Sequence, residues 1–135
     1  MVIDTSALLA ILLGEKELRE YIEIMESAAS RAISVANLVE VSIVIESRLG
    51  GDGLRDLDLF VERAGIEVIE VDLEQGRLAR RAYGRFGKGR HPAGLNYGDC
   101  FAYALAMARG EPLLYKGDDF SKTDVVRVFR DASGG

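Results

Sequence analysis

Apolar residues in this chain fall into short runs that alternate with longer segments of helical period. The short runs lie at 1–4, 32–35, 66–71, 113–115 and 125–129, and their length and apolar character predict five buried strands. Between them, apolar positions with helical spacing predict helices at 7–13, 15–29, 37–49, 54–64, 72–86 and 97–109. Strands separated by helices favour right-handed crossovers and a parallel sheet covered on both faces. The expected fold class is therefore α/β, a single three-layer domain around a central, mainly parallel five-stranded sheet.

Capping residues and glycines set the expected ends of these elements. Asn37 is expected to begin the helix that the Gly50–Gly51 pair ends, and Asp72 to cap the helix that runs to about Phe86. Glycines between 84 and 98 predict a loop before the alanine-rich helix. Residues 131–135 are expected to be a loose tail, so the domain is expected to cover residues 1–130.

Composition narrows the possible classes of protein. The chain has 135 residues, 48% hydrophobic and 29% charged, which is typical of one globular domain. No apolar run approaches the roughly 18–20 residues that cross a bilayer, so no membrane association is expected. With Cys100 as its only cysteine and His91 as its only histidine, the chain has no internal disulfide, Cys/His zinc site or serine-protease-type triad. The first residues lack the basic region of a secretory signal, and a cytoplasmic location is expected.

Charge is unevenly distributed along the chain. The formal net charge is −5, which argues against a protein that coats nucleic acid by bulk positive charge. However, residues 77–91 contain no Asp or Glu and carry six of the 17 basic side chains, namely Arg77, Arg80, Arg81, Arg85, Lys88 and Arg90. One basic segment therefore stands out from an otherwise acidic chain.

Acidic residues recur where the predicted strands end or the predicted helices begin. Asp4 ends the first strand, Asp118 and Asp119 follow the fourth, and Glu40 and Asp99 lie in the first turns of two helices. Ligands of open parallel sheets bind beyond the carboxyl ends of the strands, where these acids are expected to meet.

Each acid also has a structural explanation when it is considered alone. Asp4 is a good helix cap, Asn96 and Asp99 have the spacing of a capping box, and the acidic pair suits a turn. Glu40 has no such explanation, because an ionised carboxylate among apolar neighbours is costly to bury.

Carboxylates gathered at one place require a cation, because they otherwise raise one another's pKa. Oxygen ligands without His or Cys favour Mg²⁺ or Mn²⁺, and such an ion activates water and offsets charge on a phosphate. The pattern therefore predicts hydrolysis of phosphodiester bonds.

Four blocks of the sequence resemble PIN-domain ribonucleases, and more narrowly VapC toxins of bacterial toxin–antitoxin pairs. They are Val2–Ala7, the helix around Glu40, Leu95–Cys100 and Lys116–Phe120, and they span nearly the whole chain in the order of that family. The resemblance implies a metal-dependent endoribonuclease that dimerises and is silenced by a cognate antitoxin.

The resemblance also assigns roles to residues. It implies that Asp4, Glu40, Asp99 and Asp118 or Asp119 are catalytic, that Asp4 and Asp99 bind the metal, and that Thr5, Ser6 and Asn96 support them. Many relatives carry a Thr-x-Asp pattern after the fourth strand, where this chain has Tyr115 and Gly117. The fourth acid is therefore displaced, and the choice between the two aspartates stays open.

The basic segment lies just before Asp99 and is expected to hold the RNA backbone. The candidate RNA-binding residues are Arg81, Arg85, Lys88, Arg90 and His91, with Tyr83 and Phe86 as possible stacking surfaces. The structural alternative is a solvated helix face.

Two other functions compete with the ribonuclease. An aspartyl-phosphate phosphatase would use Asp4 as nucleophile with Lys116 nearby, although Ser6 stands where that chemistry normally needs a second acid. A non-catalytic module that binds RNA or protein would keep the fold without the activity.

Overall fold

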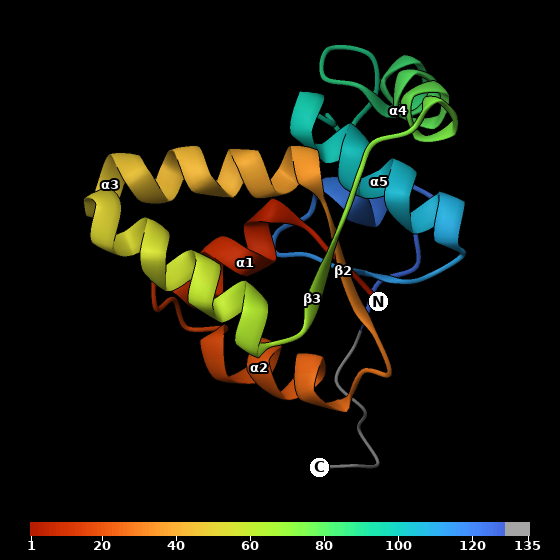
Figure 1. Ribbon diagram of the computed structural model, residues 1–135. Coiled ribbons are helices and arrows are strands. Elements are labelled where there is room, and N and C mark those ends of the chain that lie inside the picture. Colours follow the sequence, from red (N-terminus) through yellow and green to blue (C-terminus); the bar gives the residue numbers. More distant parts are fainter. Residues whose placement is uncertain (129–135) are drawn as a thin grey trace.

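Four strands form a single sheet with the order β3-β2-β1-β4, and all neighbouring strands are parallel (Figure 1). The computed structural model describes residues 1–128. The strands are β1 (Val2–Ile3), β2 (Arg31–Ser34), β3 (Ile66–Ile69) and β4 (Leu113–Leu114). The helices are α1 (Thr5–Leu12), α2 (Leu18–Ser27), α3 (Val35–Arg63), α4 (Leu73–Phe86) and α5 (Tyr97–Arg109), followed by a 3₁₀ turn, η1 (Asp119–Lys122). The α/β class and the three-layer arrangement are confirmed.

Alternate side chains along the strands pack against the helices on opposite faces of the sheet. Val2 packs into a core with residues of α4 and α5, whereas its neighbour Ile3 packs with α1, α2 and α3. Successive side chains of a strand point to opposite faces of the sheet. Because helices cover both faces, the strands are apolar throughout. None of the helices within residues 1–128 is both long and apolar enough to span a bilayer.

The expected fifth strand is wrong for the residues that the structure describes. Residues 125–128 run beside β4, where the Leu113 N–H donates to the Val126 carbonyl at 2.8 Å and the Val128 N–H donates to the Leu113 carbonyl at 3.0 Å. This contact amounts to one parallel bridge between Leu113 and Arg127, because β4 itself is only two residues long. Phe129 and the expected tail at 131–135 lie outside the described residues.

Helix α3 begins earlier than its sequence pattern indicates. Ser34, the last residue of β2, is its N-cap, with its Oγ accepting a hydrogen bond from the Ala36 N–H at 3.3 Å. Asn37 was the expected start and instead lies buried inside the first turn. The two predicted helices at 37–49 and 54–64 are the two arms of α3, which meet in a kink at Gly50 (Figure 1). The glycine pair was expected to end the first helix, but the second arm resumes directly after Gly50.

The parallel topology brings the carboxyl ends of β1 and β4 beside the first turns of α1, α3 and α5. Asp4 caps α1, Asn37 of α3 donates to the Gly98 carbonyl of α5, and Lys116 after β4 donates to Ser6 of α1. Residues from distant parts of the sequence therefore meet there.

Candidate active site

Asp4 follows β1 and caps α1, and it uses only one of its carboxylate oxygens to do so. Its Oδ2 accepts hydrogen bonds from the Ser6 N–H at 3.0 Å and the Ser6 hydroxyl at 2.5 Å. Its Oδ1 is buried and has no hydrogen-bond partner. Burial raises the pKa of Asp4 to about 6, and the charge of Glu40 acts in the same direction. The second oxygen is therefore buried without a hydrogen-bond donor.

Asp99 likewise uses one carboxylate oxygen for a hydrogen bond at the start of α5. Its Oδ2 accepts from the Asn96 N–H at 3.0 Å while Asn96 Oδ1 accepts from the Asp99 N–H at 2.9 Å, which completes the capping box. Burial raises the pKa of Asp99 to about 7, and the negative charges of Asp4, Asp119 and Glu40 add to the effect. These four acids therefore share one electrostatic environment.

Glu40 is held between α1 and α5. Its Oε1 accepts a hydrogen bond from the Thr5 hydroxyl at 2.5 Å. Its carboxylate lies directly against the Cα of Gly98, so closely that a Cβ at this position would overlap both carboxylate oxygens. Glycine at position 98 therefore leaves the space that Glu40 occupies.

Asn37 joins three helices beneath this cluster, a role that its sequence position did not reveal. Its buried side-chain amide donates to Thr5 Oγ1 at 3.1 Å and to the Gly98 carbonyl at 3.0 Å. One turn separates Asn37 from Glu40 on α3, and this shared helix face was the signal available in the sequence. Asn37 thus fixes the residues that hold Glu40.

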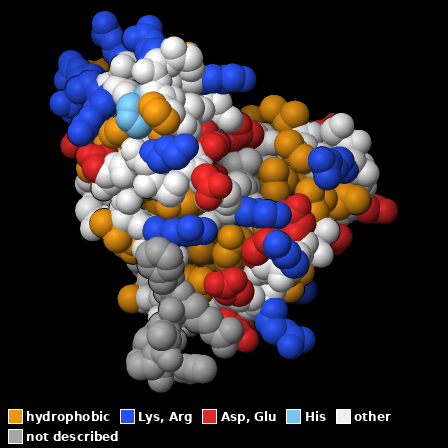
Figure 2. Space-filling model, turned by 180° about the vertical axis from the view of Figure 1, so that it is seen from behind, with side chains coloured by type: hydrophobic (Ala, Val, Ile, Leu, Met, Phe, Trp, Pro, Cys, Tyr) orange, Lys and Arg blue, Asp and Glu red, His pale blue; other side chains and the backbone are white. Residues whose placement is uncertain are grey.

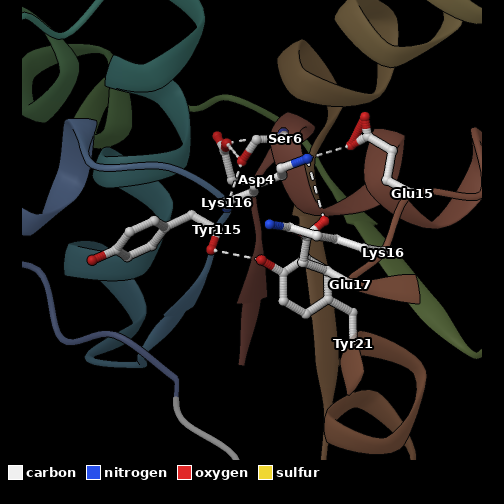
Figure 3. Close-up of polar contacts among 8 residues, drawn as sticks. All are labelled: Asp4, Ser6, Glu15, Lys16, Glu17, Tyr21, Tyr115 and Lys116. Carbon is white, nitrogen blue, oxygen red and sulfur yellow. Dashed lines mark hydrogen bonds and ion pairs between the residues drawn. The ribbon is translucent and has the colours of Figure 1, made fainter. Parts of the chain in front are cut away.

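Lys116 connects the loop after β4 to α1 and to the segment between α1 and α2 (Figure 3). Its backbone N–H donates to Ser6 Oγ at 2.9 Å, while its Nζ contacts Glu15 at 2.9 Å and Glu17 at 3.2 Å. Because the ammonium group is engaged by these two glutamates, it does not neutralise Asp4. This contact argues against the phosphatase, which needs a lysine beside the nucleophilic aspartate.

Asp118 and Asp119 are both exposed but differ in what they face. The charge of Asp119 contributes to the raised pKa of Asp99, whereas the charge of Asp118 contributes to that of Tyr115. The Asp118 carbonyl also accepts a hydrogen bond from the Ser121 N–H at 3.1 Å in the 3₁₀ turn. Asp119 is therefore the member of the pair that acts on the buried acids.

The donor set fits a hard divalent cation that keeps part of its water shell. Among residues 1–128, no three acidic, histidine or cysteine side chains form a ready-made cation site. However, the unpartnered Oδ1 of Asp4 and the raised pKa values of Asp4 and Asp99, caused by burial and by neighbouring negative charges, are what an added positive charge would relieve. Ions that bind through a few carboxylates and several waters match such an open, all-oxygen arrangement.

Basic side chains gather beside this edge, on α4 and the loop at 87–96. Figure 2 shows them at one end of the face seen from behind, with acidic side chains nearer its middle. Arg81, Arg85, Lys88 and Arg90 are exposed and His91 is half-buried. Arg85 contacts Asp124 at 3.4 Å, and His91 Nδ1 accepts a hydrogen bond from the Ala93 N–H at 3.0 Å.

The structure corrects one of the two expected stacking surfaces. Phe86 is 5% exposed and packs in the core against Tyr103 and His91, because it lies on the face of α4 that meets α5. Tyr83 is 40% exposed. The most exposed aromatic side chain of residues 1–128 is that of Tyr97, at 78%, a residue outside the predicted RNA-binding segment.

Comparison with known proteins connects this geometry to a family. The PIN domain model matches residues 1–126. Ribonuclease VapC of Mycolicibacterium smegmatis is 53% identical over 132 residues, which cover 95% of this chain and 99% of that protein. Ribonuclease VapC30 of Mycobacterium tuberculosis is 48% identical over 128 residues, with coverage of 95% and 98%.

Solved structures show the same fold at lower sequence identity. Mycobacterium tuberculosis VapC20, described as a sarcin–ricin loop cleaving toxin, superposes with a TM-score of 0.78 at 17% identity and covers 96% of this chain and 98% of its own. DNA-bound VapBC from Salmonella typhimurium gives a TM-score of 0.74 at 18% identity, with coverage of 95% of each chain.

Proposed function

This chain belongs to the PIN-domain family, and we propose on that basis that it is a metal-dependent endoribonuclease, the toxin of a VapBC-type toxin–antitoxin pair. The observation that carries the proposal is the shared electrostatic environment of Asp4, Glu40, Asp99 and Asp119, which come from distant segments. The high identity to ribonucleases over nearly the whole chain supports the same substrate class.

Asp4 and Asp99 are the proposed ligands of Mg²⁺ or Mn²⁺. Each uses one oxygen for a helix cap, so Ser6 and Asn96 orient these carboxylates while leaving the other oxygen for the cation. The cation supplies Lewis-acid activation of water and offsets charge on the phosphate.

Glu40 is proposed to orient the attacking water or to assist in metal binding. The Thr5 hydroxyl and the surface of Gly98 hold its carboxylate in place. Asp119 is proposed as the fourth acid, because its charge reaches Asp99, whereas Asp118 acts on Tyr115.

The basic segment is proposed to hold the RNA backbone. Lys88, Arg90 and His91 lie on the loop that ends at Asn96, and Asn96 caps the helix that carries Asp99. Arg81 and Arg85 continue the positive charge along α4. Positive side chains there would offset repulsion between a polyanion and the acidic site.

Two further properties follow from the proposed toxin role. We infer that a cognate antitoxin covers the toxin and that the chain forms a homodimer, as the VapBC complexes among the similar structures suggest for the antitoxin. We also infer a cytoplasmic location, because an enzyme whose substrate is cellular RNA works where that RNA is.

Cleavage of structured RNA by the purified chain tests the proposal. We expect cleavage with Mg²⁺ or Mn²⁺, none in EDTA, and a loss of roughly 100-fold or more in Asp99→Asn, because a bound cation contributes several kcal/mol of transition-state stabilisation. The matched control is Asp56→Asn, which changes an exposed carboxylate on α3 and should leave the rate unchanged. Cleavage in EDTA, or an undiminished rate in Asp99→Asn, would refute the mechanism.

A further inference from the structure

A groove with a volume of about 510 Å³ runs between α4 and α5. Its lining includes Gly76, Arg80 and Tyr83 from α4, and Tyr97 and Phe101 from α5. We call it the aromatic groove. Neither the metal chemistry nor the proposed backbone contacts use it.

The groove exists because of a glycine on one wall and an aromatic pair on the other. A Cβ built at Gly76 would meet no atom within 4 Å, so this turn of α4 leaves open space. Tyr97 and Phe101 lie one helical turn apart on α5 with their rings in edge contact, 4.8 Å between centroids. An aromatic ring as exposed as that of Tyr97 forgoes much of the free energy that its burial would provide, so a ligand that covers it would recover that free energy.

The charge around the groove favours an anionic ligand. Arg80 lies in its wall, and the guanidinium of Arg90 lies over the Tyr83 ring at 5.6 Å from the centroid. The segment 77–91 has no acidic residue, so a second copy packed symmetrically on this face would bring like charges together. Flat apolar rings flanked by arginines instead match a nucleobase with its phosphates.

We propose that the aromatic groove binds an unstacked base of single-stranded RNA, adjacent to the phosphodiester bond that is cleaved. Tyr97 and Tyr83 provide stacking surfaces, and Arg80 and Arg90 contact the flanking phosphates. Tyr97 and Asp99 share the first turn of α5, so a strand that crosses this helix end meets the groove and the acidic site in succession. The proposal rests on RNA as the substrate of the proposed function.

Two pairs of variants test whether the groove binds a base. Binding of a fluorescein-labelled single-stranded RNA is measured by anisotropy in EDTA, where the proposed enzyme is not active. We expect Tyr97→Ala to weaken binding at least about 5-fold, the lower end of base–aromatic stacking, and Tyr97→Phe to retain wild-type affinity. Gly76→Leu should also weaken binding by filling the groove, whereas Gly84→Leu on the same helix, where a Cβ also meets no atom within 4 Å, should not.

RNA with one base removed gives a readout that a structural role would not produce. An abasic site at one position of the RNA should weaken binding to wild-type protein as much as Tyr97→Ala weakens binding to intact RNA. Tyr97→Ala with that abasic RNA should bind no more weakly than with either change alone. Equal affinity of Tyr97→Ala and wild type, or full additivity at every abasic position, would overturn the proposal. Dissociation of a dimer in Tyr97→Ala with unchanged RNA affinity would assign the groove to a second copy and also overturn it.

The failure of the base site and the failure of the proposed function can be told apart. Metal-dependent cleavage without the abasic pattern would refute the base site alone. The abasic pattern together with metal-independent cleavage, or with none, would refute the ribonuclease mechanism while the base site stands.

Discussion

At the scale of single residues, structural and chemical roles are combined in the same carboxylates. Asp4 caps α1 with its Oδ2, and Asp99 uses its Oδ2 to accept the Asn96 N–H in the capping box of α5, as the capping patterns of the sequence predicted; each has a second oxygen outside these bonds. The cap fixes the direction of the carboxylate, so the structural role supports the proposed metal-binding role. The two readings of these residues are therefore not alternatives.

Gly98→Ala tests how closely the activity depends on the position of Glu40. The added Cβ would overlap the Glu40 carboxylate, which can move because it is the end of a flexible side chain. We therefore expect a folded protein with cleavage reduced roughly 10- to 100-fold, the range seen when supporting groups of a metal site are lost. Cleavage rates and circular dichroism measure the two effects.

Gly84→Ala is the matched control for this substitution. Its Cβ would meet no atom within 4 Å, and it lies in a helix like Gly98. Full activity in Gly98→Ala would show that the position of Glu40 does not matter for cleavage.

The sequence predicted the acids and the supporting residues Thr5, Ser6 and Asn96, which hydrogen-bond to them, but it did not single out Asn37 or Gly98. Acids at strand ends and helix starts are visible because the parallel topology collects those positions. The contacts of Asn37 and Gly98 depend on how α1, α3 and α5 pack against one another, and the sequence shows only that Asn37 and Glu40 share a face of α3. The same packing buries Phe86 and exposes Tyr97.

At the scale of elements, Gly50 determines the angle between the two arms of α3. Its backbone angles, φ 68° and ψ −161°, lie in a region that only glycine adopts at low cost. We expect Gly50→Ala to lower the free energy of unfolding by about 1–3 kcal/mol, and urea unfolding measures it. Gly51→Ala, whose Cβ also meets no atom within 4 Å and whose φ is not positive, should be neutral or slightly stabilising. Equal effects of the two substitutions would contradict this explanation of the kink.

Element boundaries were predicted where a local signal decides them and missed where tertiary contacts decide them. Asp72 caps α4 as expected, and the glycine pair that was expected to end a helix marks the kink of α3 instead. Ser34 caps α3 although the apolar run continues through Val35, because β2 ends at that point. The apolar run from 125 predicted a strand, but its partner β4 is too short to build a ladder with it.

At the scale of the whole molecule, the acidic cluster makes stability depend on pH. Burial raises the pKa of Asp4 from 3.8 to about 6 and that of Asp99 from 3.8 to about 7, so the folded state holds these protons more tightly than the unfolded chain does. The free energy of unfolding of the metal-free protein should therefore fall as pH rises from about 4 to 7. For the buried Asp4 the loss is on the order of 2–3 kcal/mol, and Asp4→Asn should remove that part of the pH dependence.

Divalent cations should reverse this loss, and the reversal should itself depend on pH. Protons and the cation compete for the same carboxylates, so Mg²⁺ should raise the melting temperature more at pH 8 than at pH 5.5, where Asp4 and Asp99 are largely protonated. At a concentration 100 times its dissociation constant the cation would add about 2.7 kcal/mol to the free energy of unfolding. Thermal unfolding with Mg²⁺ and with EDTA at both pH values measures this, with Asp99→Asn as the variant that should lose the shift and Asp56→Asn as the control that should keep it. If the rise in melting temperature with Mg²⁺ is the same at both pH values, or persists in Asp99→Asn, the cation binds elsewhere. The acidic cluster would then be stable without a bound cation.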